Sequence, residues 1–202
     1  MDKQLKYSTG IKIKPFLYIE LKKMAKLKAD NPEMTDSKLK TKTVEDNIFQ
    51  YKNPNRRKEV ASTILKRLKV LDNYLLNLLI NGSMDISKYI AVYSILKTDR
   101  LFYEFMDEVY KDKYQARDPY LTDKDFNIYF QHKAEQSDRV AGWTDYTYYN
   151  LKRVFIKILV QAGLINNEKE RKITKALINK EVIDHLINND DPKYIQAMLG
   201  GI

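Results

Sequence analysis

Residues 144–163 read TDYTYYNLKRVFIKILVQAG, and they indicate the fold class more clearly than any other stretch. Six apolar residues recur at the spacing that lines one face of an α-helix: Leu151, Val154, Phe155, Ile158, Leu159 and Ala162. Thr144 is a typical N-cap residue, and Gly163 is typical of the position just after a helix. The stretch therefore predicts a long amphipathic helix that packs its apolar face into a core.

The opposite side of this helix contains aromatic, amide and basic residues: Tyr146, Tyr149, Asn150, Arg153 and Lys157. Such groups can reach base edges and phosphates in DNA. An ordinary amphipathic helix with a solvated polar back gives the same pattern. The pattern favours nucleic-acid binding but does not require it.

The segments around the long helix predict a winged helix-turn-helix over residues 122–174. A capped helix from Thr122 to about residue 136 and a short turn of helix precede it, and two short extended pieces follow it. These pieces predict a small β-hairpin. In a winged helix the last long helix enters the major groove, and the hairpin lies beside it as a wing. Arg171 and Lys172 at the hairpin tip would then meet phosphates, although two glutamates dilute the charge there.

The rest of the chain also favours helices, because it contains only six Gly and five Pro in 202 residues. We expect a mainly α, multi-helix protein with a helix-turn-helix-like N-terminal part and a winged-helix-like C-terminal part. The turn residues Asn81-Gly82 place the domain boundary. The predicted domains are 1–82 and 83–202.

Positive charge is concentrated in the N-terminal third. Residues 1–70 have 18 Lys/Arg and 8 Asp/Glu, whereas the whole chain has a net charge of +9. Arg56, Arg57 and Lys58 gather at a predicted helix start, where backbone N–H groups also favour phosphate. A polyanion partner accounts for this asymmetry, and a generally Lys-rich composition is the alternative.

Catalytic and cofactor sites are poorly supported. The chain has no Cys and two isolated His, so neither a metal site nor a disulfide framework is predicted. The six glycines form no phosphate-binding loop. The cluster Asp118, Asp123 and Asp125 suggests a carboxylate metal site, but helix capping alone explains Thr122 and Asp125. We expect no enzyme activity, no cofactor, no membrane span and a cytoplasmic location.

Five segments in one order also point to a known family. They are EDNIFQ (45–50) followed by Arg56-Arg57, KTDRLFYEFM (97–106), KAEQS (133–137), WTD (143–145) and QAGL (161–164). From about Tyr7 to Gly200 the chain resembles the BrxA proteins of bacteriophage exclusion (BREX) defence systems. The resemblance implies a small helical DNA-binding component that works beside larger defence proteins and has no catalytic residues of its own.

The leading hypothesis is therefore a non-enzymatic protein that binds double-stranded DNA and assembles with other BREX proteins. Two alternatives stay open: a scaffold subunit whose basic face meets an acidic protein, and an RNA-binding helical protein. The sequence does not set the oligomeric state, the DNA sequence or which of the two basic faces dominates.

Overall fold

Short polar side chains cap the N-termini of several helices, including the two that the sequence predicts after Thr122 and Thr144. Thr35, Asn53, Asp72, Thr122 and Thr144 each accept a hydrogen bond from a backbone N–H in the first turn of the helix that follows. These bonds satisfy N–H groups that have no partner inside the helix. At Thr122 the N3 carboxylate of Asp125 also accepts from the N-cap backbone, which completes the predicted capping box.

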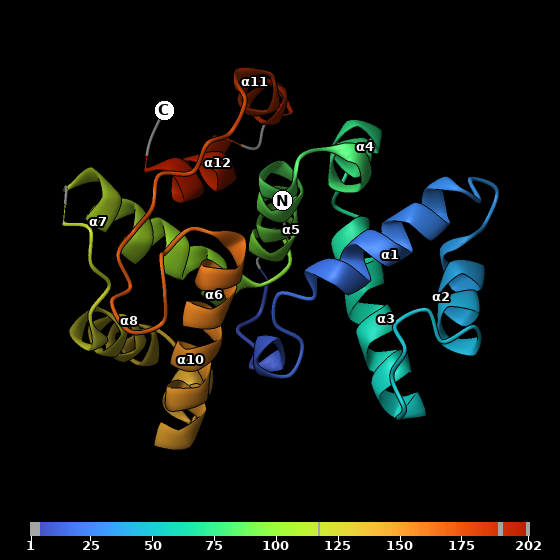
Figure 1. Ribbon diagram of the computed structural model, residues 1–202. Helices are drawn as coiled ribbons and strands as arrows, with labels where there is room; N and C mark the ends of the chain where they lie inside the picture. The colour runs from blue at the N-terminus through green and yellow to red at the C-terminus, as the bar shows by residue number, and fades with distance from the viewer. Residues whose placement is uncertain (1–4, 117, 190–191, 201–202) are drawn as a thin grey trace. The chain divides into compact units, whose positions relative to one another are not determined.

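The computed structural model describes residues 5–116, 118–189 and 192–200, and it divides the chain into two units (Figure 1). Phe16–Ser94 form one unit, which we call the inserted unit. Met1–Pro15 and Ile95–Ile202 form the other, the main unit, so the inserted unit interrupts it in sequence. Both units are helical, which confirms the mainly α fold class.

The inserted unit contains α1 (Tyr18–Ala29), α2 (Asp36–Glu45), α3 (Pro54–Leu68), α4 (Asn73–Asn81) and most of α5 (Met84–Leu96). Helix α3 packs against α1 and α2 and buries Val60, Ile64 and Leu68. Arg67 is also buried on this side, and its guanidinium donates to the carbonyl oxygen of Phe16 at 2.8 Å. This bond ties the start of the unit to its central helix.

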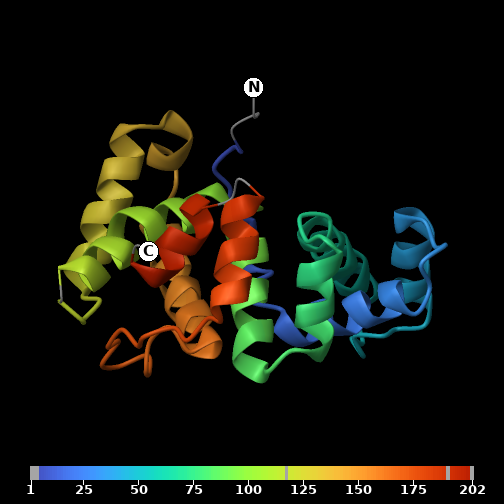
Figure 2. The ribbon, with the colours of Figure 1, turned by 90° about the horizontal axis from the view of Figure 1, so that it is seen from above.

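The main unit contains the other helices: η1 (Gly10–Lys12), α6 (Arg100–Phe105), the π-helical turn η2 (Met106–Tyr110), α7 (Lys111–Gln115), α8 (Asp123–Glu135), α9 (Asp138–Ala141), α10 (Asp145–Ala162), α11 (Lys180–Asn188) and α12 (Pro192–Leu199). Its core is aromatic. Phe105 lies between Phe126 and Phe155, with ring centroids 4.8 and 5.3 Å apart. This packing joins α6, α8 and α10, and α12 lies along η2 and α7 (Figure 2).

Gly82 follows α4 with φ −68°, so it does not adopt the left-handed conformation that is typical of a glycine just after a helix. Glycine is required there for space, since a Cβ would lie 2.5 Å from the carbonyl oxygen of Leu78. The β-hairpin is not confirmed either. Residues 164–174 contain no strand, only the isolated antiparallel bridge Ile165–Ile173 and a second bridge from Lys172 to Tyr120.

The predicted domains 1–82 and 83–202 differ from the two units, which change at residues 94/95 and return residues 1–15 to the main unit. That residues 1–82 and 83–202 fold as separate domains stays a prediction. Within the described ranges, none of the helices combines the length and the apolar character needed to cross a membrane.

Candidate nucleic-acid interface

Helix α10 has the two faces that its sequence predicts. Five of the six stripe residues are buried, with Leu151, Phe155, Ile158 and Leu159 fully enclosed, whereas Val154 at the edge of the stripe is half-buried. Gly163 ends the helix with φ 76°, a left-handed conformation that glycine adopts without strain. One buried residue, Ile156, lies outside the stripe that periodicity suggested.

The opposite face of α10 is exposed to solvent. Tyr146 and Tyr149 are 73% and 51% exposed, values that are unusual for large aromatic side chains. The Arg153 guanidinium lies 5.6 Å from the Tyr149 ring centroid, so the two form a cation–π pair. The exposed Lys157 and the half-buried Asn150, whose side-chain amide donates to the carbonyl of Tyr146 at 2.8 Å, complete this surface, which we call the α10 face. It presents rings, an amide and positive charge side by side.

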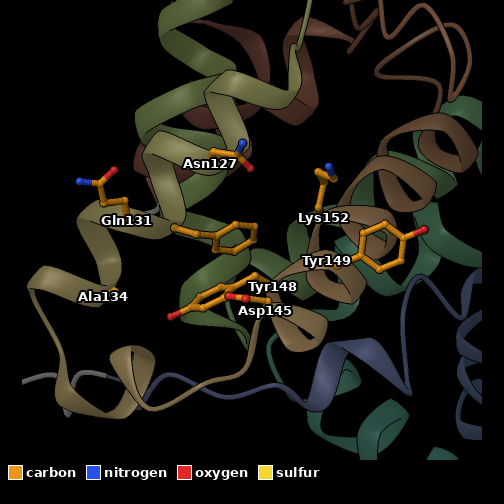
Figure 3. A pocket seen from close by; sticks show the side chains of 8 residues that line it. Asn127, Gln131, Ala134, Asp145, Tyr148, Tyr149 and Lys152 are labelled. Carbon is orange, nitrogen blue, oxygen red and sulfur yellow. The ribbon is translucent and has the colours of Figure 1, made fainter.

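A groove of about 330 Å³ runs beside the α10 face, between α8 and α10 (Figure 3). Phe130 and Gln131 of α8 and Asp145, Tyr148 and Lys152 of α10 line it. The hydroxyl of Tyr148 donates to the carbonyl of Val140 at 2.6 Å, which fixes one wall. Lys152, which the sequence pattern did not single out, adds a cation on this side of the helix.

Arg171 is held by a carboxylate. Its guanidinium forms an ion pair with Asp123 at the start of α8, and Lys152 Nζ lies 3.4 Å from the same carboxylate. The hydrogen bond from Arg171 and the two nearby cations hold the pKa of Asp123 below its ordinary value, although burial opposes this. Arg171 thus fastens residues 164–174 to α8. Lys172, by contrast, is exposed.

The tip between the two extended pieces is a tight polar turn. Asn167 Oδ1 accepts from the backbone N–H groups of Lys169 and Glu170 at 2.9 and 2.7 Å. Arg171 follows with φ 55°, a conformation that costs a non-glycine residue energy. Asn166 N–H then donates to the carbonyl of Lys172 at 2.9 Å, which holds the two pieces together.

In the inserted unit, the predicted basic residues at the start of α3 differ in their surroundings. Arg57 Nε donates to the carbonyl of Tyr51 at 2.6 Å, so this guanidinium secures the preceding loop. Arg56 lies over the Tyr51 ring, with 5.7 Å from its Cζ to the centroid. Lys58 is exposed. The five predicted residues of α10 thus lie together on the α10 face, and Arg171 and Lys172 belong to the same main unit. Arg56, Arg57 and Lys58 belong to the inserted unit.

A partly buried ionic cluster lies in the main unit around the buried Lys133, and the sequence pattern did not reveal it. Glu104 accepts hydrogen bonds from Arg100 at 2.6 Å, from Lys133 at 2.8 Å and from the Tyr7 hydroxyl at 2.8 Å. Lys133 is 2% exposed and also pairs with Glu108 at 2.5 Å. Lys133 lies three residues after the buried Phe130 of α8, a spacing that could have signalled its burial.

The cluster explains what two of the family segments do. Residues 97–106 supply Arg100 and Glu104, and residues 133–137 supply Lys133 and Gln136, whose carbonyl oxygen lies 3.4 Å from Lys133 Nζ. Burial alone would raise the pKa of Glu104, but the hydrogen bonds from its three donors lower it below the ordinary value. Both segments therefore stabilise the fold.

The carboxylates near the start of α8 are paired with cations. Lys113 Nζ lies 2.6 Å from Asp118 and 3.1 Å from Asp125, and Asp123 pairs with Arg171. Across the described part of the chain, no group of three or more potential ligands is placed to hold a metal ion.

Comparison with known proteins is consistent across sequence and structure. The model of the BrxA family matches residues 5–190. The chain is 44% identical to the BREX protein BrxA of Bacillus cereus over 99% of its own length and 100% of that protein. It is 24% identical to the BREX protein BrxA of Paramagnetospirillum magneticum over 76% of its length and 77% of that protein. A crystal structure of an uncharacterized protein from Magnetospirillum magneticum has the same fold, with a TM-score of 0.81, 22% identity, and coverage of 98% of this chain and 100% of that one.

Proposed function

Because the chain belongs to the BrxA family, whose members are components of BREX phage defence, we propose that it is a non-enzymatic, cytoplasmic component that binds double-stranded DNA and assembles with other BREX proteins. The observation that carries the DNA-binding part is the α10 face. Tyr146, Tyr149 and Arg153 stand exposed on a helix whose opposite side is firmly packed. Rigid helices position contact groups better than loops do.

The surroundings of α10 support a winged-helix mode of binding. Helices α8 and α9 precede it, and the bridged residues 164–174 follow it, with a third extended piece at Tyr120. In this proposal α10 enters the major groove, and Lys172 meets a phosphate beside it. Arg171 positions the tip through Asp123. The Arg171 guanidinium can itself contact DNA only when its ion pair with Asp123 opens.

Arg56 and Lys58 of α3 are a second proposed contact, in which a helix-turn-helix-like part of the inserted unit meets phosphate. Arg57 acts there as a structural residue, because its guanidinium bonds the loop before α3. The α10 face has exposed aromatic side chains as well as charge, so we assign it the larger share of binding.

A salt series with duplex DNA tests this function. Lys and Arg contacts displace condensed counterions, so with about four phosphate contacts a fourfold rise in salt should weaken binding roughly 150-fold. Single-stranded RNA of equal length should compete poorly. Binding that stays flat across the series, or that RNA removes more efficiently than duplex DNA, would contradict the proposal.

The purified chain is also expected to show no metal-dependent nuclease, ATPase or methyltransferase turnover. Activity that copurifies with the protein and disappears in Asp123→Asn or Asp125→Asn would overturn the non-enzymatic assignment.

A further inference from the structure

Residues 5–15 form a segment that we call the N-terminal strap. It reads LKYSTGIKIKP and contains three lysines and no acidic residue. Two of its side chains are buried, with Tyr7 5% and Ile11 3% exposed. The strap is therefore a docked part of the main unit and not a loose extension of the inserted unit that follows it in sequence.

One end of the strap is fastened to the ionic cluster. The Tyr7 hydroxyl donates to Glu104, and the Arg100 guanidinium lies over the Tyr7 ring at 4.0 Å from the centroid. Burial and the hydrogen bond to Glu104 raise the pKa of Tyr7 to about 12, so the hydroxyl stays protonated at neutral pH. Tyr7 thus adds a donor and an aromatic face to a cluster that joins α6 and α8.

The other end of the strap lies against α10. Helix η1, which contains Ile11, packs on α10, and Lys12 Nζ lies 3.3 Å from Thr147 Oγ1. Thr147 precedes Asn150 by three residues, so the two are neighbours on the helix surface. Lys12 is therefore at the edge of the α10 face. The acidic residue of the first turn, Asp145, lies on the groove side of the helix.

The strap also offers cations that are not neutralised. Among the residues that the structure describes, Lys6 and Lys12 have no carboxylate within ion-pair distance, in contrast to Lys111, Lys113 and Lys133. The hydroxyl of Thr147 is a weak partner for an ammonium group. The position of Lys12 suits an anion that approaches along α10.

We propose that the N-terminal strap is part of the DNA interface, with Lys12 meeting the phosphate backbone alongside α10 and Lys6 a second phosphate. This inference rests on the proposed DNA-binding function of the α10 face. Basic N-terminal arms that accompany a helix in the major groove are an established way to bind duplex DNA. Here the arm is fixed before binding by Tyr7 and Ile11, so little conformational entropy is lost when DNA arrives.

The test compares two double variants of the full chain in salt series with the same duplex. Lys6→Ala/Lys12→Ala removes the strap cations. Lys180→Ala/Lys193→Ala removes the same charge from exposed positions on α11 and α12. If each strap lysine meets one phosphate, the first variant should lower the salt slope, which is the slope of log binding constant against log salt concentration, by about 1.8. The factor by which a fourfold rise in salt weakens binding should then be about 12 times smaller for this variant than for wild type. The second should keep the wild-type slope.

Each outcome decides the inference. A single Lys12→Arg variant that keeps the wild-type slope, together with the lower slope of the strap double variant, would support a phosphate contact. If the strap variant behaves like its control while Arg153→Ala/Lys157→Ala loses binding, the strap inference is wrong and the proposed function stands. If the wild-type chain binds no duplex DNA, both fail. Far-ultraviolet circular dichroism of all variants checks that the fold is intact.

Discussion

At the scale of single residues, Glu104 is the site where pH should affect stability most directly. Its side chain is 15% exposed, and the side chain of its partner Lys133 is 3% exposed. The hydrogen bonds of the cluster lower the pKa of Glu104 in the folded state below 4.5, its value in the unfolded chain. The ionised carboxylate therefore stabilises the fold fully at pH values above 4.5. That stabilisation is lost as the pH falls below 4.5, through the lowered folded-state pKa.

Glu104→Gln tests this. The variant weakens the hydrogen bonds from Arg100, Lys133 and Tyr7 but leaves Lys133 paired with Glu108, so it should cost about 1.5 to 3 kcal/mol, the range for hydrogen bonds to charged groups. Urea unfolding at neutral pH should show this loss. The difference between wild type and variant should shrink as the pH falls below 4.5, where wild-type Glu104 becomes protonated. A difference that is constant over the whole acidic range would contradict the cluster's ionic character.

Arg57 and Lys58 make a second residue-scale comparison. Arg57→Ala removes the bond to the Tyr51 carbonyl and should cost about 1.5 to 3 kcal/mol of stability, the range for hydrogen bonds to charged groups. Lys58→Ala, on an exposed side chain, should change stability by less than about 0.5 kcal/mol. Thermal or urea unfolding measures both. Equal stabilities would show that the Arg57 contact contributes nothing to the fold.

At the scale of an element, α10 separates stability from binding by face. Tyr149→Ala, Arg153→Ala and Lys157→Ala change exposed residues, so each should alter stability by less than about 0.5 kcal/mol. Their combination should strongly weaken binding to duplex DNA, and the loss of two cations should lower the salt slope by about two. Gel shifts and urea unfolding on the same preparations measure the two effects.

The matched control lies on the apolar side of the same helix. Leu151→Ala or Phe155→Ala opens a cavity in the core and should cost roughly 2 to 5 kcal/mol. Binding should then fall only as far as the fold does. If the triple variant binds like wild type while Arg56→Ala/Lys58→Ala does not, the inserted unit carries the function and the α10 assignment is wrong.

At the scale of the whole molecule, local chemistry was predictable from sequence and distant pairing was not. The cap at Thr122 and the end of α10 at Gly163 depend on neighbouring residues only, and both were predicted. The ion pair of Arg171 joins residues 48 positions apart, so periodicity could not reveal that this predicted contact residue is already engaged. The Tyr7–Glu104 bond spans 97 positions, and the strap was therefore missed as well.

The interruption of the main unit by the inserted unit also has a consequence for how the chain folds. The contact between Lys12 and Thr147 joins residues 135 positions apart. Closing a loop of this length is slow compared with local helix formation. The inserted unit comprises only residues 16–94, so we expect it to fold while the end of the main unit is still missing. Pulse-labelled hydrogen exchange during refolding should protect amides of α3 before those of η1. Trypsin pulses should cut after Lys12 in that early species and spare the same bond once the fold is complete.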